Sequence, residues 1–149
     1  VILLDFIVTR SISRDQICGL LEKSWAHLQA LREALGDGAG IVRMGHALVP
    51  LDESLAQVAI DLGGRGYAVL DLGLGEATIG DLPGDLVRHF LESLAAEGKF
   101  AIHARVLEGV NPHHKAEAIF KSLARAMRKA LTFDPRLENK VPSTKGKIG

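Results

Sequence analysis

Hydrophobic positions recur three or four residues apart in three segments, which is the spacing of one helix face. The first predicted helix spans 13–35 and opens with a capping-box pattern, Ser13 followed by Gln16. The second predicted helix spans 85–97 and the third spans 111–131. Three amphipathic helices of this length must each bury an apolar face against another element.

The two later helices carry clear boundary and burial signals. In the second, Leu86, Phe90 and Leu94 are the expected buried face, and Gly98 is the expected residue just past the end. The third opens with Asn111–Pro112, a favourable N-cap followed by proline in the first turn. Its expected apolar face comprises Ile119, Phe120, Leu123, Met127 and Leu131.

Shorter segments have the apolar runs or the alternation of strands. The predicted strands are 1–8, 45–50, 55–62, 67–72 and 100–107. The glycine-rich turn 63–66 predicts a hairpin between the strands on either side of it. In the last strand, His103 and Arg105 share the face opposite the apolar residues. Segment 73–84 is expected to be a glycine-dotted loop and 135–149 a polar tail.

Helices and strands alternate, while the middle strands are expected to pair locally. This combination predicts an α+β fold, with helices on one face of a mixed or antiparallel sheet. The apolar run 1–8 is expected to be a buried strand, because a membrane span needs roughly 20 apolar residues. It is also not preceded by the basic region of a signal peptide.

The composition narrows the classes of function. Lys and Arg together number 18, as do Asp and Glu, so the 149-residue chain has zero formal net charge. Zero charge argues against general nucleic-acid binding and against attachment to anionic membranes, which both favour a basic surplus. The single cysteine, Cys18, precludes an internal disulfide and fits a reducing compartment.

The strongest candidate for chemistry is the start of the third helix. His113 and Glu117 are four positions apart and His114 and Glu117 are three apart, so all three are neighbours on a helix, with Lys121 continuing that face. Two imidazoles and a carboxylate suit Zn, Mn, Fe or Ni. A solvated polar first turn explains the same pattern, and one helical turn rarely supplies a complete site. The residues alone leave both interpretations open.

The other histidines are weaker candidates. His89 lies at the edge of an apolar helix face and could complete a metal site, although a half-buried structural histidine explains it equally well. His103 is expected to have a structural or supporting role, and His27 and His46 belong to no motif.

A second constellation suits an anion. Arg65 lies in the Gly-Gly-Arg-Gly turn, and 143–146 (STKG) offers hydroxyls and an ammonium group, with Arg43 as a further donor. As a bare pattern, STKG is also explained by an ordinary polar tail.

Several phrases in order resemble the imidazoleglycerol-phosphate dehydratase family. They are ALREALGD (30–37), VPLDESLA (49–56), DLGGRGY (61–67), LVRHF (86–90), IHARVLEGVNPHHKAEAIFKSLARAMRKA (102–130) and VPSTKG (141–146). The resemblance implies a dehydratase-like domain over 30–149 with a phosphate-binding tail, preceded by a divergent segment, 1–29. It also implies half-units of the ribosomal protein S5 domain 2-like fold, the first of them incomplete.

The resemblance further implies a manganese hydro-lyase of histidine biosynthesis that converts imidazole glycerol phosphate to imidazole acetol phosphate. The implied metal ligands are His89, His113, His114 and Glu117, with Glu117 and His89 also catalytic. The implied phosphate-binding residues are Arg43, Arg65, Ser143 and Lys145, and His103 and Lys121 are supporting residues. A cytoplasmic shell of twenty-four subunits with sites between subunits is expected, or a plastid one if the source is a plant.

The N-terminal part departs from the family pattern. Where the first half of the family carries HHxxED, the matching stretch 17–22 reads ICGLLE, so ligands for about half of a two-manganese site are expected. Two alternatives stay open: a truncated or catalytically dead member that keeps phosphate and partial metal binding, or an RNA-binding module on the same fold. A basic surface would favour the RNA-binding module, and the zero net charge disfavours it.

Overall fold

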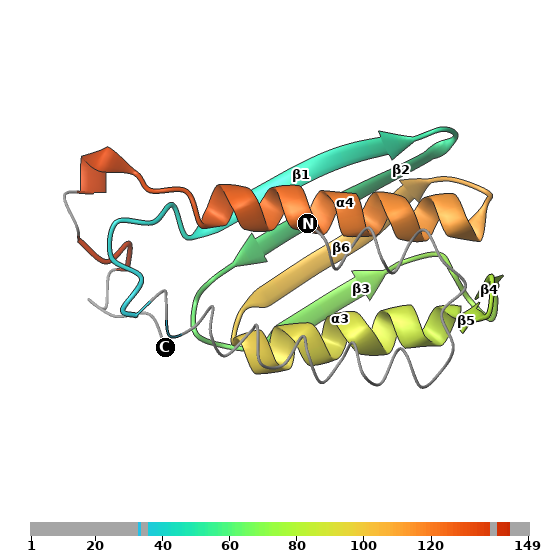
Figure 1. Cartoon of the computed structure of the whole chain (residues 1–149), viewed down its shortest axis with the longest axis horizontal. Coiled ribbons are helices and arrows are strands. Elements are labelled where there is room, and N and C mark those ends of the chain that lie inside the picture. The colour runs from blue at the N-terminus through green and yellow to red at the C-terminus, as the bar shows by residue number, and fades with distance from the viewer. Residues whose placement is uncertain (1–32, 34–35, 138–139, 144–149) are drawn as a thin grey trace.

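The computed structural model describes residue 33, residues 36–137 and residues 140–143 (Figure 1). The predicted strand 1–8, nearly all of the predicted helix 13–35, and the residues Cys18, His27 and Lys145 lie outside these described residues.

A four-stranded sheet with the order β1-β2-β6-β3 forms the centre of the described fold. Its strands are β1 (Met44–Leu51), β2 (Ser54–Asp61), β3 (Tyr67–Asp71) and β6 (Ala101–Glu108). β1, β2 and β6 are antiparallel neighbours, whereas β3 pairs parallel to β6. The sheet is therefore mixed.

The predicted hairpin between 55–62 and 67–72 is wrong. β2 and β3 do not pair, because β6 lies between them and bonds to both. The glycine-rich segment 63–66 carries the chain past that position and is no tight hairpin turn. The real hairpin joins β1 to β2 through a loop of Asp52 and Glu53, with Asp52 at φ +46°.

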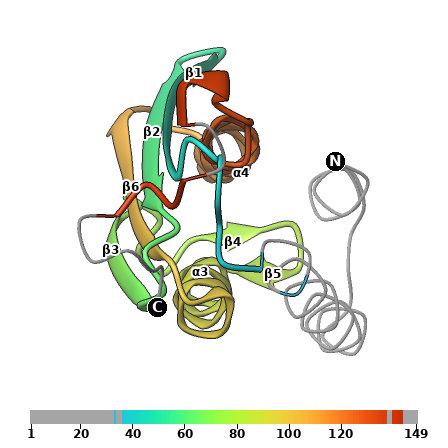
Figure 2. The same ribbon diagram turned by 90° about the vertical axis from the view of Figure 1, so that its left-hand side faces the viewer.

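Two helices cover one face of this sheet, as Figure 2 shows. They are α3 (Gly84–Gly98) and α4 (Pro112–Ala130). The α+β prediction, with helices on one face of a mixed sheet, is confirmed. A second sheet of two short strands, β4 (Thr78–Ile79) and β5 (Leu82–Pro83), forms inside the segment expected to be a loop, and a 3-10 turn, Pro135–Leu137, follows α4.

The buried face of α3 is displaced by one residue from the prediction. Val87, Leu91 and Ala95 are buried, while Leu86, Phe90 and Leu94 are half-buried. The left-handed residue that ends the helix is Lys99, at φ +53°, rather than Gly98. The sequence still predicts a helix here, because the residues that are buried and the residues that were expected to be buried both recur at helical spacing.

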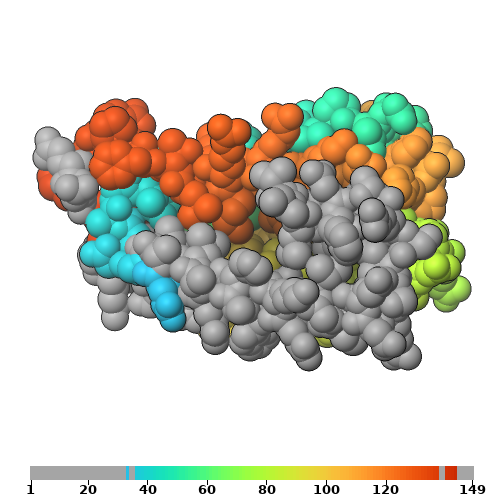
Figure 3. Space-filling model, in the orientation of Figure 1, coloured from blue at the N-terminus to red at the C-terminus, as the bar shows by residue number. Residues whose placement is uncertain are grey.

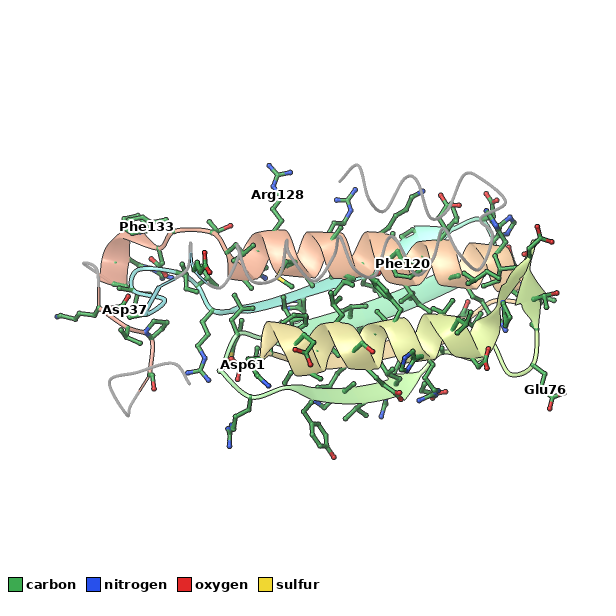
Figure 4. The ribbon with its side chains drawn as sticks, turned by 60° about the horizontal axis from the view of Figure 1, so that its bottom comes forward. Asp37, Asp61, Glu76, Phe120, Arg128 and Phe133 are labelled. Atoms are coloured by element: carbon green, nitrogen blue, oxygen red, sulfur yellow. The ribbon has the colours of Figure 1, made fainter. Side chains whose placement is uncertain are left out.

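α4 begins as predicted. Asn111 is the N-cap, with Oδ1 accepting from the backbone N–H of His113 at 2.9 Å, and Pro112 follows it. From the predicted face, Ile119, Phe120 and Leu123 are buried. Figure 4 shows Phe120 between the two helices, where its ring meets that of Phe90 edge-on, with centroids 5.7 Å apart.

α4 lies along β1 and β2, and small residues make this close approach possible. Ala126 and Ala130 of α4 are fully buried. A Cβ atom added to Gly45 of β1 would collide with the backbone carbonyl of Ala126. Since a helix backbone cannot yield as a flexible side chain can, position 45 requires glycine.

We expect Gly45→Ala to lower the free energy of unfolding by about 1–3 kcal/mol, the usual cost of overpacking a tight contact. The measurement is urea unfolding followed by circular dichroism. Arg125→Ala is the control, because Arg125 is exposed on α4 and its truncation should cost under about 0.5 kcal/mol. Equal stability of the Gly45 variant and the wild type would contradict the close packing.

Candidate functional site

The hairpin loop between β1 and β2 meets the start of α4 at one end of the fold (Figures 1 and 3). Glu53 Oε1 accepts hydrogen bonds from the backbone N–H groups of Val110 and Asn111, at 3.2 and 2.8 Å, and from the Ser54 hydroxyl at 3.1 Å. One carboxylate oxygen therefore fixes the chain just before α4 to the hairpin loop.

Glycine makes this junction possible. Gly109 has φ +143°, and a Cβ atom there would collide with the Oγ of the buried Ser54. The loop before α4 can approach the hairpin closely only without a side chain at this position.

His114 points at the hairpin loop. Its Nδ1 lies 2.7 Å from Glu53 Oε2, and its Nε2 lies 3.6 Å from Asp52 Oδ2. The hydrogen bond to Glu53 raises the pKa of His114, although partial loss of hydration opposes this change. In return, the bonds from His114 and from the Asn111 N–H hold the pKa of Glu53 well below its usual range.

His113 belongs to a second set of contacts along α4. Its Nε2 lies 3.3 Å from Glu117 Oε2, and the Lys121 ammonium lies 2.7 Å from Glu117 Oε1. Glu117 is thus bracketed by an imidazole and an ammonium group on one helix face. Together, the six residues of these two sets form the imidazole cluster: Asp52, Glu53, His113, His114, Glu117 and Lys121.

The structure brings together some of the predicted ligands. His113 and Glu117 are in contact as expected, but His114 turns away toward Glu53, and the two imidazole centroids are 6.1 Å apart. His89 is exposed on α3, and no contact between His89 and the imidazole of His113 or His114 is described. His103 is exposed on the sheet face opposite the helices, opposite Ala59 in register; Ile102 and Ala104 on either side of it are buried.

The donor types suit manganese or a similar cation, since imidazole nitrogens and carboxylates are ordinary ligands for these ions. His113 and Glu117 are close enough to bind one cation together. Within the part of the chain that the structure describes, no group of three or more His, Cys, Asp or Glu residues converges as a metal site requires. His113 and Glu117 are therefore suited to supply two donors to a metal ion, and further donors would complete the site.

Arg43 lies at the opposite end of the β1–β2 hairpin. Its Nε and Nη2 donate to the two Asp61 carboxylate oxygens at 2.7 and 3.0 Å, and its Nη1 donates to the carbonyl of Pro142 at 2.9 Å. Asp61 raises the pKa of this guanidinium. Figure 4 shows Asp61 at this end of the sheet. Arg43, Asp61 and Pro142 form the arginine cluster.

Two further predicted phosphate-binding residues, Arg65 and Ser143, are near this end. Arg65 is exposed in the β2–β3 connection, and Ser143 directly follows Pro142. The Ser143 backbone N–H donates to Val141 at 2.7 Å. Arg43 and Ser143 are thus linked by the bond from the guanidinium to Pro142.

Sequence reasoning missed three acidic residues. Asp52 and Glu53 enter it only as part of the phrase 49–56, and Asp61 only as part of a predicted strand and of the phrase 61–67. The alternation on both sides of Asp52 and Glu53 is a signal for a hairpin whose loop carries both carboxylates. No local signal pairs Asp61 with Arg43, because they meet only through the β1–β2 register.

Among the described residues, neither α3 nor α4 combines the length and apolar character that crossing a membrane requires.

Known proteins resemble this chain over most of its length. The family model described as imidazoleglycerol-phosphate dehydratase matches residues 25–127. The dehydratase of Dehalococcoides mccartyi strain CBDB1 is 54% identical over 144 residues, which is 96% of this chain and 74% of that protein. That of Methanothermobacter thermautotrophicus is 53% identical over 120 residues, covering 80% of this chain and 60% of that protein.

Solved structures agree with the sequence comparison. The dehydratase from Staphylococcus aureus superimposes with a TM-score of 0.70 at 33% identity, covering 77% of this chain and 68% of that one. The one from Pyrococcus furiosus gives 0.68 at 33% identity, covering 86% and 72%. The chain thus spans between 60% and 74% of the length of these four relatives.

We expect Asp61→Asn to weaken the arginine cluster and to lower the free energy of unfolding by about 1 kcal/mol. This value is smaller than for a buried charged hydrogen bond, because the side chains of Arg43 and Asp61 are 17% and 32% exposed. Urea unfolding measures it, with Asp81→Asn in the exposed β4–β5 turn as the control. A stability loss no larger than that of the control would mean that the ion pair contributes nothing.

Proposed function

Because this chain belongs to the imidazoleglycerol-phosphate dehydratase family, a family of hydro-lyases in histidine biosynthesis, we propose that its two clusters are the two halves of a dehydratase site. His113, His114, Glu117 and His89 would bind Mn²⁺, and Arg43, Arg65, Ser143 and Lys145 would bind the phosphate of imidazole glycerol phosphate. The RNA-binding alternative has no support among these relatives, which are all named as dehydratases.

The reaction needs a proton to leave carbon and a hydroxyl to leave the neighbouring carbon, giving an enol that becomes the ketone. When bound, Mn²⁺ would stabilise the negative charge that develops on the substrate. Glu117 is suited to move a proton, because its carboxylate contacts both an imidazole and an ammonium group. We propose His89 as a second catalytic group on the family resemblance alone.

The separation of the two clusters supports a site formed between chains. Arg43 lies directly before β1, and the loop of Asp52 and Glu53 lies directly after it, so the clusters are separated by at least the length of β1, about 24 Å. The Arg43 N–H donates to Ala130 at one end of α4, while His113 and His114 lie at the other end. Imidazole glycerol phosphate is too short to reach both clusters of one chain.

A homo-oligomer would bring the arginine cluster of one chain beside the imidazole cluster of another. The sheet face opposite the helices offers surface for such contacts, with exposed Met44 and Leu48 on β1 and exposed Tyr67 on β3. We propose the cytoplasmic shell of twenty-four subunits that the family resemblance implies. The single cysteine fits the reducing environment of the cytoplasm.

Removal of one imidazole tests the metal assignment. We expect His113→Ala to weaken Mn²⁺ binding at least tenfold in isothermal titration, because it removes one of the two donors that already face each other. His46→Ala is the matched control, since His46 is exposed on β1 and belongs to neither cluster. Unchanged affinity in His113→Ala would remove this histidine from the site.

A mixing experiment tests whether the site is shared between chains. Arg43→Ala and His113→Ala should each lose Mn²⁺-dependent binding of imidazole glycerol phosphate. The two variants are then dissociated, mixed equally and reassembled. A site is intact only when its arginine cluster comes from a His113→Ala chain and its imidazole cluster from an Arg43→Ala chain, which applies to about a quarter of the sites. Recovered binding sites counted by titration would support the shared site, and no recovery would contradict it.

A further inference from the structure

Glu53 has two oxygens with different surroundings. Three donors surround Oε1: the backbone N–H groups of Val110 and Asn111, and the hydroxyl of Ser54. The two backbone groups are obligatory donors, so the atom at this position must accept hydrogen bonds. The orientation of the Glu53 side chain is therefore fixed by the loop that leads into α4.

Once Oε1 is held there, Oε2 faces His114. It lies 2.7 Å from Nδ1, and an ionised carboxylate can only accept. The proton of the neutral imidazole must then be on Nδ1, which leaves the lone pair on Nε2. Nε2 is 3.6 Å from Asp52 Oδ2, too far for a hydrogen bond, so no described acceptor competes for a proton at this nitrogen.

We propose that Glu53 is a positioning residue that sets the tautomer and the ring direction of His114, so that Nε2 is the nitrogen available to a metal ion. Its consequence for metal binding rests on the proposed function, whereas the tautomer itself does not. Groups that hold the second nitrogen of a metal-binding histidine commonly contribute about 10–100-fold to metal affinity.

Glu53→Gln gives a sharp test, because glutamine has the same shape but only one acceptor oxygen. The Val110 and Asn111 N–H groups require that oxygen at the Oε1 position. The amide NH₂ must then face Nδ1 of His114, which can accept only if its proton moves to Nε2. The substitution therefore keeps the loop contacts and reverses the hydrogen bond to the imidazole.

We expect the metal-free wild-type chain to have His114 protonated on Nδ1, and Glu53→Gln to have it protonated on Nε2. Two-bond ¹H–¹⁵N correlation spectra distinguish the two forms at a pH where the ring is neutral, with the His114 signals assigned from their loss in His114→Asn. Mn²⁺ affinity measured by titration should fall about 10–100-fold in Glu53→Gln. The thermal unfolding midpoint should change little, because the loop contacts remain.

The control is Glu76→Gln, which neutralises an exposed carboxylate before β4 (Figure 4) and should change neither spectrum nor affinity. An unchanged tautomer in Glu53→Gln would overturn the proposal, as would a changed tautomer with wild-type metal affinity. If the wild type binds no Mn²⁺ but the tautomer changes, the positioning role stands and the proposed metal site fails. Loss of stability without a change of tautomer would reduce Glu53 to a structural residue.

Discussion

The packing of α4 along the β1–β2 hairpin is the constraint on which the rest of the structure depends. Gly45, without a side chain, lets the backbone of α4 approach β1 at Ala126. The helix and the strand have similar lengths, about 27 Å and about 24 Å, so their ends coincide. One pair of ends carries Glu53 and His114, and the other carries Arg43 beside Ala130.

This matching of lengths explains why the two clusters are separate. The imidazole cluster is tied to the start of α4 by the hydrogen bond between Glu53 and His114, and the Arg43 backbone N–H is bonded to Ala130 at the other end of α4. The length of the helix therefore keeps the two clusters apart. A chain built in this way presents the proposed metal ligands at one end and the proposed phosphate-binding cations at the other. Any small substrate that needs both must be bound where two chains meet, which makes assembly part of the proposed chemistry.

The features that could be predicted from the sequence are those that depend on residues close together along the chain. The N-cap at Asn111, the alternation of β6 and the existence of α3 and α4 follow from local patterns, and the structure agrees. Strand pairing was mispredicted, because the choice of β6 over β3 as the partner of β2 is made by residues 40 or more positions away. The same holds for His114, whose direction is set by Glu53, 61 positions earlier. A helical wheel places His114 near Glu117 but contains nothing of the hairpin loop that turns it away.

The arginine cluster has a consequence for how phosphate would be held. The guanidinium of Arg43 uses three of its five N–H groups on Asp61 and Pro142, and the Asp61 carboxylate offsets its charge. Arg43 is therefore suited to fix the position of the segment that contains Ser143 and to offer its remaining N–H groups in a set direction. The net positive charge that attracts a phosphate must come from other cations, and the exposed Arg65 is one that follows Asp61 closely along the chain. In this proposed arrangement, Arg43 would orient the phosphate and Arg65 would attract it, so neither arginine could replace the other.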